Sequence, residues 1–308
     1  IAEQIKEAGG IDPQDIVVWK DTPVANITWK DGTKLAAGVT DQTLKDAYAN
    51  ATFTEDTNPA RKTDAAGTFP GKIKVKFADG SSIIVGEEAN KPQNLIVAEH
   101  KNEVTDPQNP PVVPKDAIEV EFKLGEGTKL GQKTGDKTTP VLVKTMLVKP
   151  DTTLVDADFP AAEKTNANAH DVVWTPADKK VTANNKTFIA TSSEKTTAEQ
   201  IKEAGGIDPQ DIVVWKDTPV ANITWKDGTK LAAGVTDQTL KDAYANATFT
   251  EDTNPARKTD AAGTFPGKIK VKFADGSSII VGEEANKPQN LIVAEHKNEV
   301  TDPQNPPV

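Results

Sequence analysis

Residues 71–86 read GKIKVKFADGSSIIVG, and this stretch decides the fold of the region around it. Ile73, Val75 and Phe77 alternate with lysines, which is the two-residue period of a strand with one buried face. Asp79-Gly80 is a favoured hairpin dipeptide, and an apolar run at 83–85 follows it. The sequence therefore predicts a β-hairpin with an apolar inner face and a lysine-bearing outer face.

The hairpin lies inside a long stretch that the chain contains twice. Residues 2–112, the first block, recur without a single change as residues 198–308, the second block. Residues 113–197, the insert, separate the two copies. Long identical repeats indicate a modular protein in which each unit folds largely by itself. Because the second block stops inside a linker that continues after the first, we expect the chain to come from a longer array.

The repeat predicts three domains and a mainly β fold class. The expected boundaries are residues 1–112, 113–196 and 197–308, with a proline-rich linker beginning at about residue 104. Each domain is large enough for a modest core of its own. We expect tandem small domains in an elongated array, two of them immunoglobulin-like sandwiches and the middle one β-grasp-like, with few short helices.

Composition excludes several function classes. The formal net charge is −10 and Arg61 and Arg257 are the only arginines, which disfavours nucleic-acid binding. The chain has no cysteine, so disulfides, thiolate nucleophiles and thiolate metal sites are absent. No apolar run is long enough to span a membrane, so no membrane insertion is expected in this segment. We expect a monomer.

Local patterns predict further elements of each block. Thr196 and Glu199 have the spacing of a helix capping box, and Ile1 occupies the place of Thr197 in the first copy, so its first residues should fray. A strand is predicted at 16–19 and another at 95–97, and the alternation of Ala25, Ile27 and Trp29 predicts a third. A second helix, of about ten residues, is expected to begin at Thr40 and run through Tyr48.

The block resembles the Rib domain. The resemblance rests on Trp29-Lys30-Asp31-Gly32 and on the run from Thr68 to Ser81, and it covers roughly residues 20–98. Phe77 stands where the family usually has tyrosine, and residues 2–19 lie outside the pattern. The resemblance implies an immunoglobulin-like fold and tandem arrays on Gram-positive cell surfaces. A streptococcal surface repeat of the fibronectin-binding kind is the alternative within the same class.

The insert begins with strict alternation of apolar and polar residues at 118–124. Two apolar runs, at 141–143 and 146–148, predict a pair of strands, residues 156–160 a short turn or helix, and 172–174 and 187–190 the closing strands. The order resembles the Listeria–Bacteroides repeat, on the motifs at 120–125, 149–154 and 174–190. That resemblance implies a β-grasp fold with a structural, adhesive role and no catalytic residues. Residues 166–170 replace the family's usual Gly-Tyr or Gly-Phe.

The linker at 105–115 reads TDPQNPPVVPK. Its four prolines favour an extended spacer that is stiffer than a glycine-serine tether.

No cluster of residues predicts a catalytic, cofactor or metal site, and we assign none. The histidines, His100, His170 and His296, stand far apart in sequence and are interpreted as surface residues. The Asp-Gly pairs at 31–32, 79–80 and 227–228 lack the EF-hand spacing and are interpreted as turns. The acidic pair at 87–88 is expected to be solvated, and the three sequons at 26, 50 and 185 are taken as coincidence.

Three features leave alternatives open. The lysines at 72, 74 and 76 could bind an anionic glycan or acidic matrix protein, but a solubilising outer face is the preferred interpretation. Trp19, Trp29 and Trp174 are expected to pack in cores rather than stack on sugars. A lysine–asparagine or lysine–aspartate isopeptide bond could replace disulfides, although the sequence selects no pair.

These observations predict a non-enzymatic repeat segment of a Gram-positive adhesin, extracellular and wall-anchored, with signal and anchor outside this segment. It would act as a stalk that holds a distal binding domain away from the wall. Host matrix proteins or glycans would be reached through the parent protein. The alternative is that the repeats themselves bind host proteins such as fibronectin or plasminogen, with avidity. A third hypothesis, a wall hydrolase or glycosidase, requires two spaced carboxylates in a cleft.

Overall fold

The computed structural model describes all 308 residues, and the hairpin at 71–86 forms as the sequence predicts. Strands β6 (Ile73–Lys76) and β7 (Ser82–Val85) pair antiparallel. Phe77 N donates to Ser81 O at 2.9 Å to close the turn, where Gly80 has φ of 85°. Strand β4 (Thr52–Glu55) pairs with the other edge of β6, so β6 is the central strand.

A second three-stranded sheet completes the first block. It has the order β2 (Ile16–Trp19), β8 (Gln93–Ala98) and β5 (Gly67–Gly71), with β2 parallel and β5 antiparallel to β8. A separate two-stranded antiparallel sheet pairs β1 (Ile11–Pro13) with β3 (Thr33–Leu35). The two three-stranded sheets share one core, whose buried strand residues are Ile16, Ile73, Val75, Ile83, Val85, Leu95 and Val97. This arrangement is compatible with the predicted immunoglobulin-like fold.

The helices are short and their caps differ from the prediction in two places. The helices are α1 (Ala2–Glu7), α2 (Gln42–Ala49), α3 (Thr197–Glu203) and α4 (Gln238–Ala245). Thr196 caps α3 as predicted, by accepting the N–H of Glu199. Asp41, not Thr40, caps α2, because its carboxylate accepts the N–H of Leu44. Helix α1 forms from Ala2 without a threonine cap, so the predicted fraying is not seen.

The strand predicted from the alternation of Ala25, Ile27 and Trp29 is wrong. Two 3-10 helices, η1 (Val24–Asn26) and η2 (Trp29–Gly32), occupy that region. Their turns close through backbone bonds, among them Asn26 N to Pro23 O at 2.8 Å. Proline at 23 fixes φ at −55° ahead of the first turn. Ile27 is still buried, so the alternation predicted the burial of this residue correctly but predicted the wrong backbone conformation.

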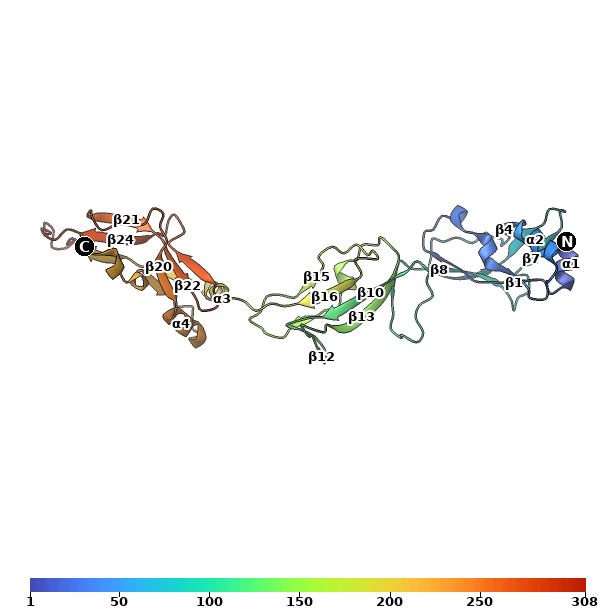
Figure 1. Cartoon of the computed structure of the whole chain (residues 1–308), viewed down its shortest axis with the longest axis horizontal. Helices are drawn as coiled ribbons and strands as arrows, with labels where there is room; N and C mark the ends of the chain where they lie inside the picture. The colour runs from blue at the N-terminus through green and yellow to red at the C-terminus, as the bar shows by residue number, and fades with distance from the viewer. The chain divides into compact units, whose positions relative to one another are not determined.

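A mixed five-stranded sheet is built mainly from the insert (Figure 1). Its order is β15 (Val173–Thr175), β16 (Thr187–Thr191), β10 (Ile118–Leu124), β13 (Val141–Val148) and β9 (Lys101–Glu103). The central strands β10 and β16 are parallel, which is compatible with the predicted β-grasp-like fold. The two strands predicted at 141–143 and 146–148 are a single strand, β13. A register shift between Phe122 and Lys123 of its partner β10 accounts for the break in the alternation of apolar residues. Three short strands form a further sheet, namely β12 (Lys133–Thr134), β11 (Thr128–Leu130) and β14 (Glu163–Lys164), and η3 (Asp156–Asp158) is the predicted short helix.

The second block repeats the elements of the first. These are β17 (Ile207–Pro209), β18 (Ile212–Trp215), η4 (Val220–Asn222), η5 (Trp225–Gly228), β19 (Thr229–Leu231), β20 (Thr248–Glu251), β21 (Gly263–Gly267), β22 (Ile269–Lys272), β23 (Ser278–Val281) and β24 (Gln289–Ala294). Residues 297–299, the counterpart of β9, form no strand. The chain is therefore a mainly β, multi-domain protein, and none of its helices has the length and apolar character to cross a membrane.

By contacts, the chain divides into two units, residues 1–165 with 171–192, and residues 166–170 with 193–308. The first block and most of the insert thus belong to one unit.

Candidate functional site

The first block and the insert share a strand. Lys101, Asn102 and Glu103, which the sequence assigns to the first domain, are β9, the edge strand of the insert's sheet. They pair antiparallel with Val148, Leu147 and Met146 of β13. Only two residues separate β9 from β8 of the block's core. The block therefore supplies the edge strand of the insert's sheet, so the expected boundary at residue 112 does not coincide with the edge of that sheet.

Side chains extend this junction on both flanks of the shared strand. Trp19 Nε1 donates to Asp116 Oδ1 at 2.9 Å, across 97 residues. Lys101 Nζ pairs with Asp158 at 2.8 Å, and the Asp158 side chain is only 13% exposed. Backbone bonds join Lys149 N to His100 O at 2.8 Å and Val104 N to Thr145 O at 2.9 Å. Backbone pairing, an indole hydrogen bond and an ion pair together make the junction a packed interface.

The proline-rich linker does not act as the predicted spacer. Val104 before it is bonded to the insert, and Asp116 after it returns to Trp19, so both ends are tied to the junction. Between them the chain turns at Asp106, whose carboxylate accepts from Gln108 N at 2.9 Å and Asn109 Nδ2 at 2.7 Å. Prolines lack the N–H that strand pairing needs, which keeps this loop out of the sheet.

The second block shows what the same residues do without a following insert. Trp19 is 5% exposed, whereas Trp215, its identical counterpart, is 58% exposed. His100 is half-buried and His296 is exposed, although the Nε2 of each donates at 2.8 Å to the carbonyl of the equivalent lysine, Lys20 or Lys216. The local sequences are identical, so the insert and its adjoining loop account for the difference.

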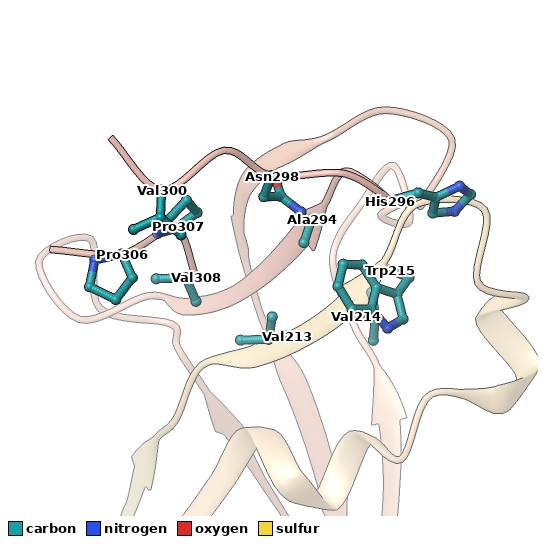
Figure 2. A pocket seen from close by; sticks show the side chains of 10 residues that line it. All are labelled: Val213, Val214, Trp215, Ala294, His296, Asn298, Val300, Pro306, Pro307 and Val308. Carbon is teal, nitrogen blue, oxygen red and sulfur yellow. The ribbon is translucent and has the colours of Figure 1, made fainter. Parts of the chain in front are cut away.

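The uncovered residues line one shallow pocket, which we call the Trp215 surface (Figure 2). Val213, Val214 and Trp215 come from β18, and Ala294 ends the neighbouring strand β24. Figure 2 also shows Pro306, Pro307 and Val308 beside Val213. The residues that line the surface are Val213, Val214, Trp215, Ala294, His296, Asn298, Val300, Pro306, Pro307 and Val308.

A buried ion pair organises the loop between β4 and β5 of the first block and its counterpart in the second block. Arg61, 7% exposed, donates from Nε to Glu55 Oε2 at 2.8 Å and from Nη2 to Glu55 Oε1 at 3.1 Å. Its Nη1 donates to the carbonyls of Phe69 and Gln93, and its guanidinium lies 5.3 Å from the centre of the Trp29 ring. This bidentate, stacked geometry suits arginine and not lysine. Sequence reasoning missed the role of Arg61, although a single arginine in a lysine-rich block was the available signal.

The contacts with Arg61 favour the charged form of the Glu55 carboxylate. Burial alone raises the pKa of Glu55, but hydrogen bonds from Arg61 and Thr57 outweigh it and leave the pKa below its ordinary value. Arg257 and Glu251 repeat the pair in the second block. With its polar groups bonded inside the protein, this cluster has the character of a structural element and not of a binding site.

The predicted lysine stripe does face outward. Ile73 and Val75 are fully buried, whereas Lys76 is exposed and Lys74 half-buried on the opposite face of β6. Because β6 is the central strand of its sheet, this is an outer face and not a sheet edge. Neither Lys74 nor Lys76 makes an ion pair, so both charges are available to an anionic partner.

The other single residues make local contacts. His170 lies 2.6 Å from Glu199, at the start of the second block, and no group of three or more His, Asp or Glu side chains is placed to hold a metal ion. Asp275 of the second hairpin accepts from Ser277 and from the N–H of Thr197, so this turn anchors the start of α3. Glu87 and Glu88 are exposed.

The tryptophans and lysines bear on two of the open alternatives. Trp29 packs against the core of the first block, and Trp174 against the insert core with Phe122 and Phe159, as predicted. Trp19 is buried at the junction and not within one domain's core. No lysine is among the buried residues.

No protein-family model matches the chain, and no curated protein matches it.

Proposed function

We propose that the chain is a repeat segment of the stalk of a bacterial surface adhesin, with no enzymatic activity. The stalk would be extracellular and wall-anchored on a Gram-positive cell, and it would project a distal binding domain. The observation that carries the proposal is the shared strand between the first block and the insert, in a chain whose block recurs unchanged. A strand-paired junction limits swivelling between neighbours, and identical units extend an array without changing its chemistry.

Small-angle scattering on chains with one, two and three blocks tests this role. A stalk predicts a maximum dimension that grows in nearly equal steps with each added block and insert. A maximum dimension that stays constant as units are added would show that the units collapse on one another, and the stalk proposal would then be wrong.

A second function, binding of host matrix by the blocks themselves, is favoured by the unpaired lysines on β6 and β22. Each block repeats the pattern, since Lys270 and Lys272 correspond to Lys74 and Lys76. Two weak sites on one chain can give avidity. The partner would carry negative charge, as an anionic glycan or an acidic segment of fibronectin or plasminogen does.

Surface plasmon resonance with the whole chain separates the two functions. If the blocks bind, charge reversal at all four lysines abolishes the signal on fibronectin, plasminogen or a sulfated glycan, and raising the salt weakens it. Charge reversal at Lys45 and Lys241, which lie on the helices α2 and α4, is the matched control and should preserve binding. A pure stalk gives no signal with any of these chains.

A further inference from the structure

The two blocks have the same sequence, and the structure shows one with its neighbour and one without. In the first block, the region around Trp19 is covered and residues 101–103 are paired with β13. In the second block, Trp215 is 58% exposed, Val213 is 49% exposed and Val300 is 55% exposed. An aromatic and aliphatic surface of this kind on a protein otherwise rich in charged residues marks a contact site.

The backbone of residues 297–300 offers unpaired hydrogen-bonding groups beside this apolar surface. In the first block the equivalent residues pair as β9, and Val104 N donates to Thr145 O. Residues 297–299 form no strand, and Val300 N has no backbone partner. The second block therefore carries a segment without backbone pairing next to an exposed tryptophan.

We propose that the Trp215 surface is the docking site for a further insert domain, with the sequence of residues 113–196, joined after Val308 in the same chain. Residues 297–299 pair with that domain's equivalent of β13, and its equivalent of Asp116 accepts the hydrogen bond from Trp215 Nε1. The functional unit of the array is then a block together with the insert that follows it, and not the separate block or insert.

The source of the occupant follows from the first junction. An insert from a second molecule has the edge of its β13 occupied by its own β9, as here. An insert that follows in the same chain has no other strand for that edge. The proposal concerns surfaces of this chain alone, so it does not depend on the stalk function or on any cellular location.

The test compares the chain with an extended chain in which residues 113–196 are repeated after Val308. Acrylamide quenching is measured for each chain and for its Trp215→Phe variant, so that the difference reports Trp215 alone. Docking predicts that Trp215 is readily quenched in the present chain and protected in the extended one, to the level that Trp19→Phe reports for Trp19.

Two controls make the outcome decisive. Val300→Pro removes the backbone donor equivalent to Val104 N, so it should restore quenching of Trp215 in the extended chain and leave the present chain unchanged. An appended insert that carries Asp116→Ala should leave the Trp215 indole N–H in rapid hydrogen exchange.

The proposal is overturned if Trp215 stays equally quenchable after extension. It is also overturned if sedimentation shows that the present chain dimerises and that Trp215→Ala abolishes the dimer, because the occupant would then be a second copy. Neither result bears on the scattering and binding tests of the proposed function.

Discussion

Replacing Trp19 by alanine should cost far more stability than replacing Trp215, although the same 17 residues precede and the same 93 residues follow each site. The two side chains differ in exposure, at 5% and 58%. A fully buried tryptophan removes up to about 250 Å² from water. The difference in exposure is about half of that area, and at about 25 cal/mol per Å² it corresponds to roughly 3 kcal/mol.

The estimate rests on area, and two further effects act in the same direction. Trp19→Ala leaves a cavity at a packed junction, and incomplete relaxation around a cavity adds to the cost. It also removes the hydrogen bond to Asp116, worth about 1 kcal/mol. Trp215 has no such partner in this chain, so the second substitution lacks both effects.

Urea denaturation followed by circular dichroism measures the difference. For a domain of this size the dependence of unfolding free energy on urea is about 1–2 kcal/mol per molar. A difference of about 3 kcal/mol therefore places the first transition of Trp19→Ala roughly 2 M below that of Trp215→Ala. Trp19→Phe and Trp215→Phe serve as controls that keep most of the buried area. Equal midpoints for the two alanine variants would refute the reasoning, because they would show that the insert does not stabilise the first block.

Three other predictions follow from the buried pair and the hairpin turn. Arg61→Met should destabilise the first block by about 3–5 kcal/mol because it leaves the Glu55 carboxylate buried without its cation. Urea unfolding checks this, and the double variant Arg61→Met with Glu55→Gln should recover part of the lost stability. Gly71→Ala should prevent the loop from closing, because a Cβ there would clash with Thr57 Oγ1 and would lie 2.7 Å from Arg61 Cζ. Loss of the first block's cooperative unfolding transition checks this, and a transition like that of the unsubstituted chain would contradict it. The pKa values of Glu55 and Glu251 are lowered and that of Asp275 is lowered to about 2, so these groups stabilise the fold above pH of about 4 and that contribution is lost as the pH falls toward 2. Melting temperatures from pH 7 to 2 should show this loss, and Asp275→Asn should flatten the profile below pH of about 4 while melting lower at pH 7.

Elements whose residues interact locally can be predicted from the sequence alone. The hairpin at 71–86, the cap at Thr196 and strand β10 follow from a two-residue period, a favoured turn and a capping box, all of which act within a few residues. The lysine face of β6 and the mainly β class followed from the same patterns. Where the period failed, at residues 24–32, burial was predicted correctly but the backbone closed into 3-10 turns.

Tertiary structure decided the features that join distant residues. Nothing within the block marks Trp19 as a partner of Asp116, or Arg61 as the ligand of Glu55 and two carbonyls, because those contacts depend on how sheets pack. The two blocks differ in this way, because the sequence Lys-Asn-Glu is a strand at 101–103 and is not one at 297–299. Identical residues take different structures there because a strand exists only where a neighbouring strand accepts its hydrogen bonds.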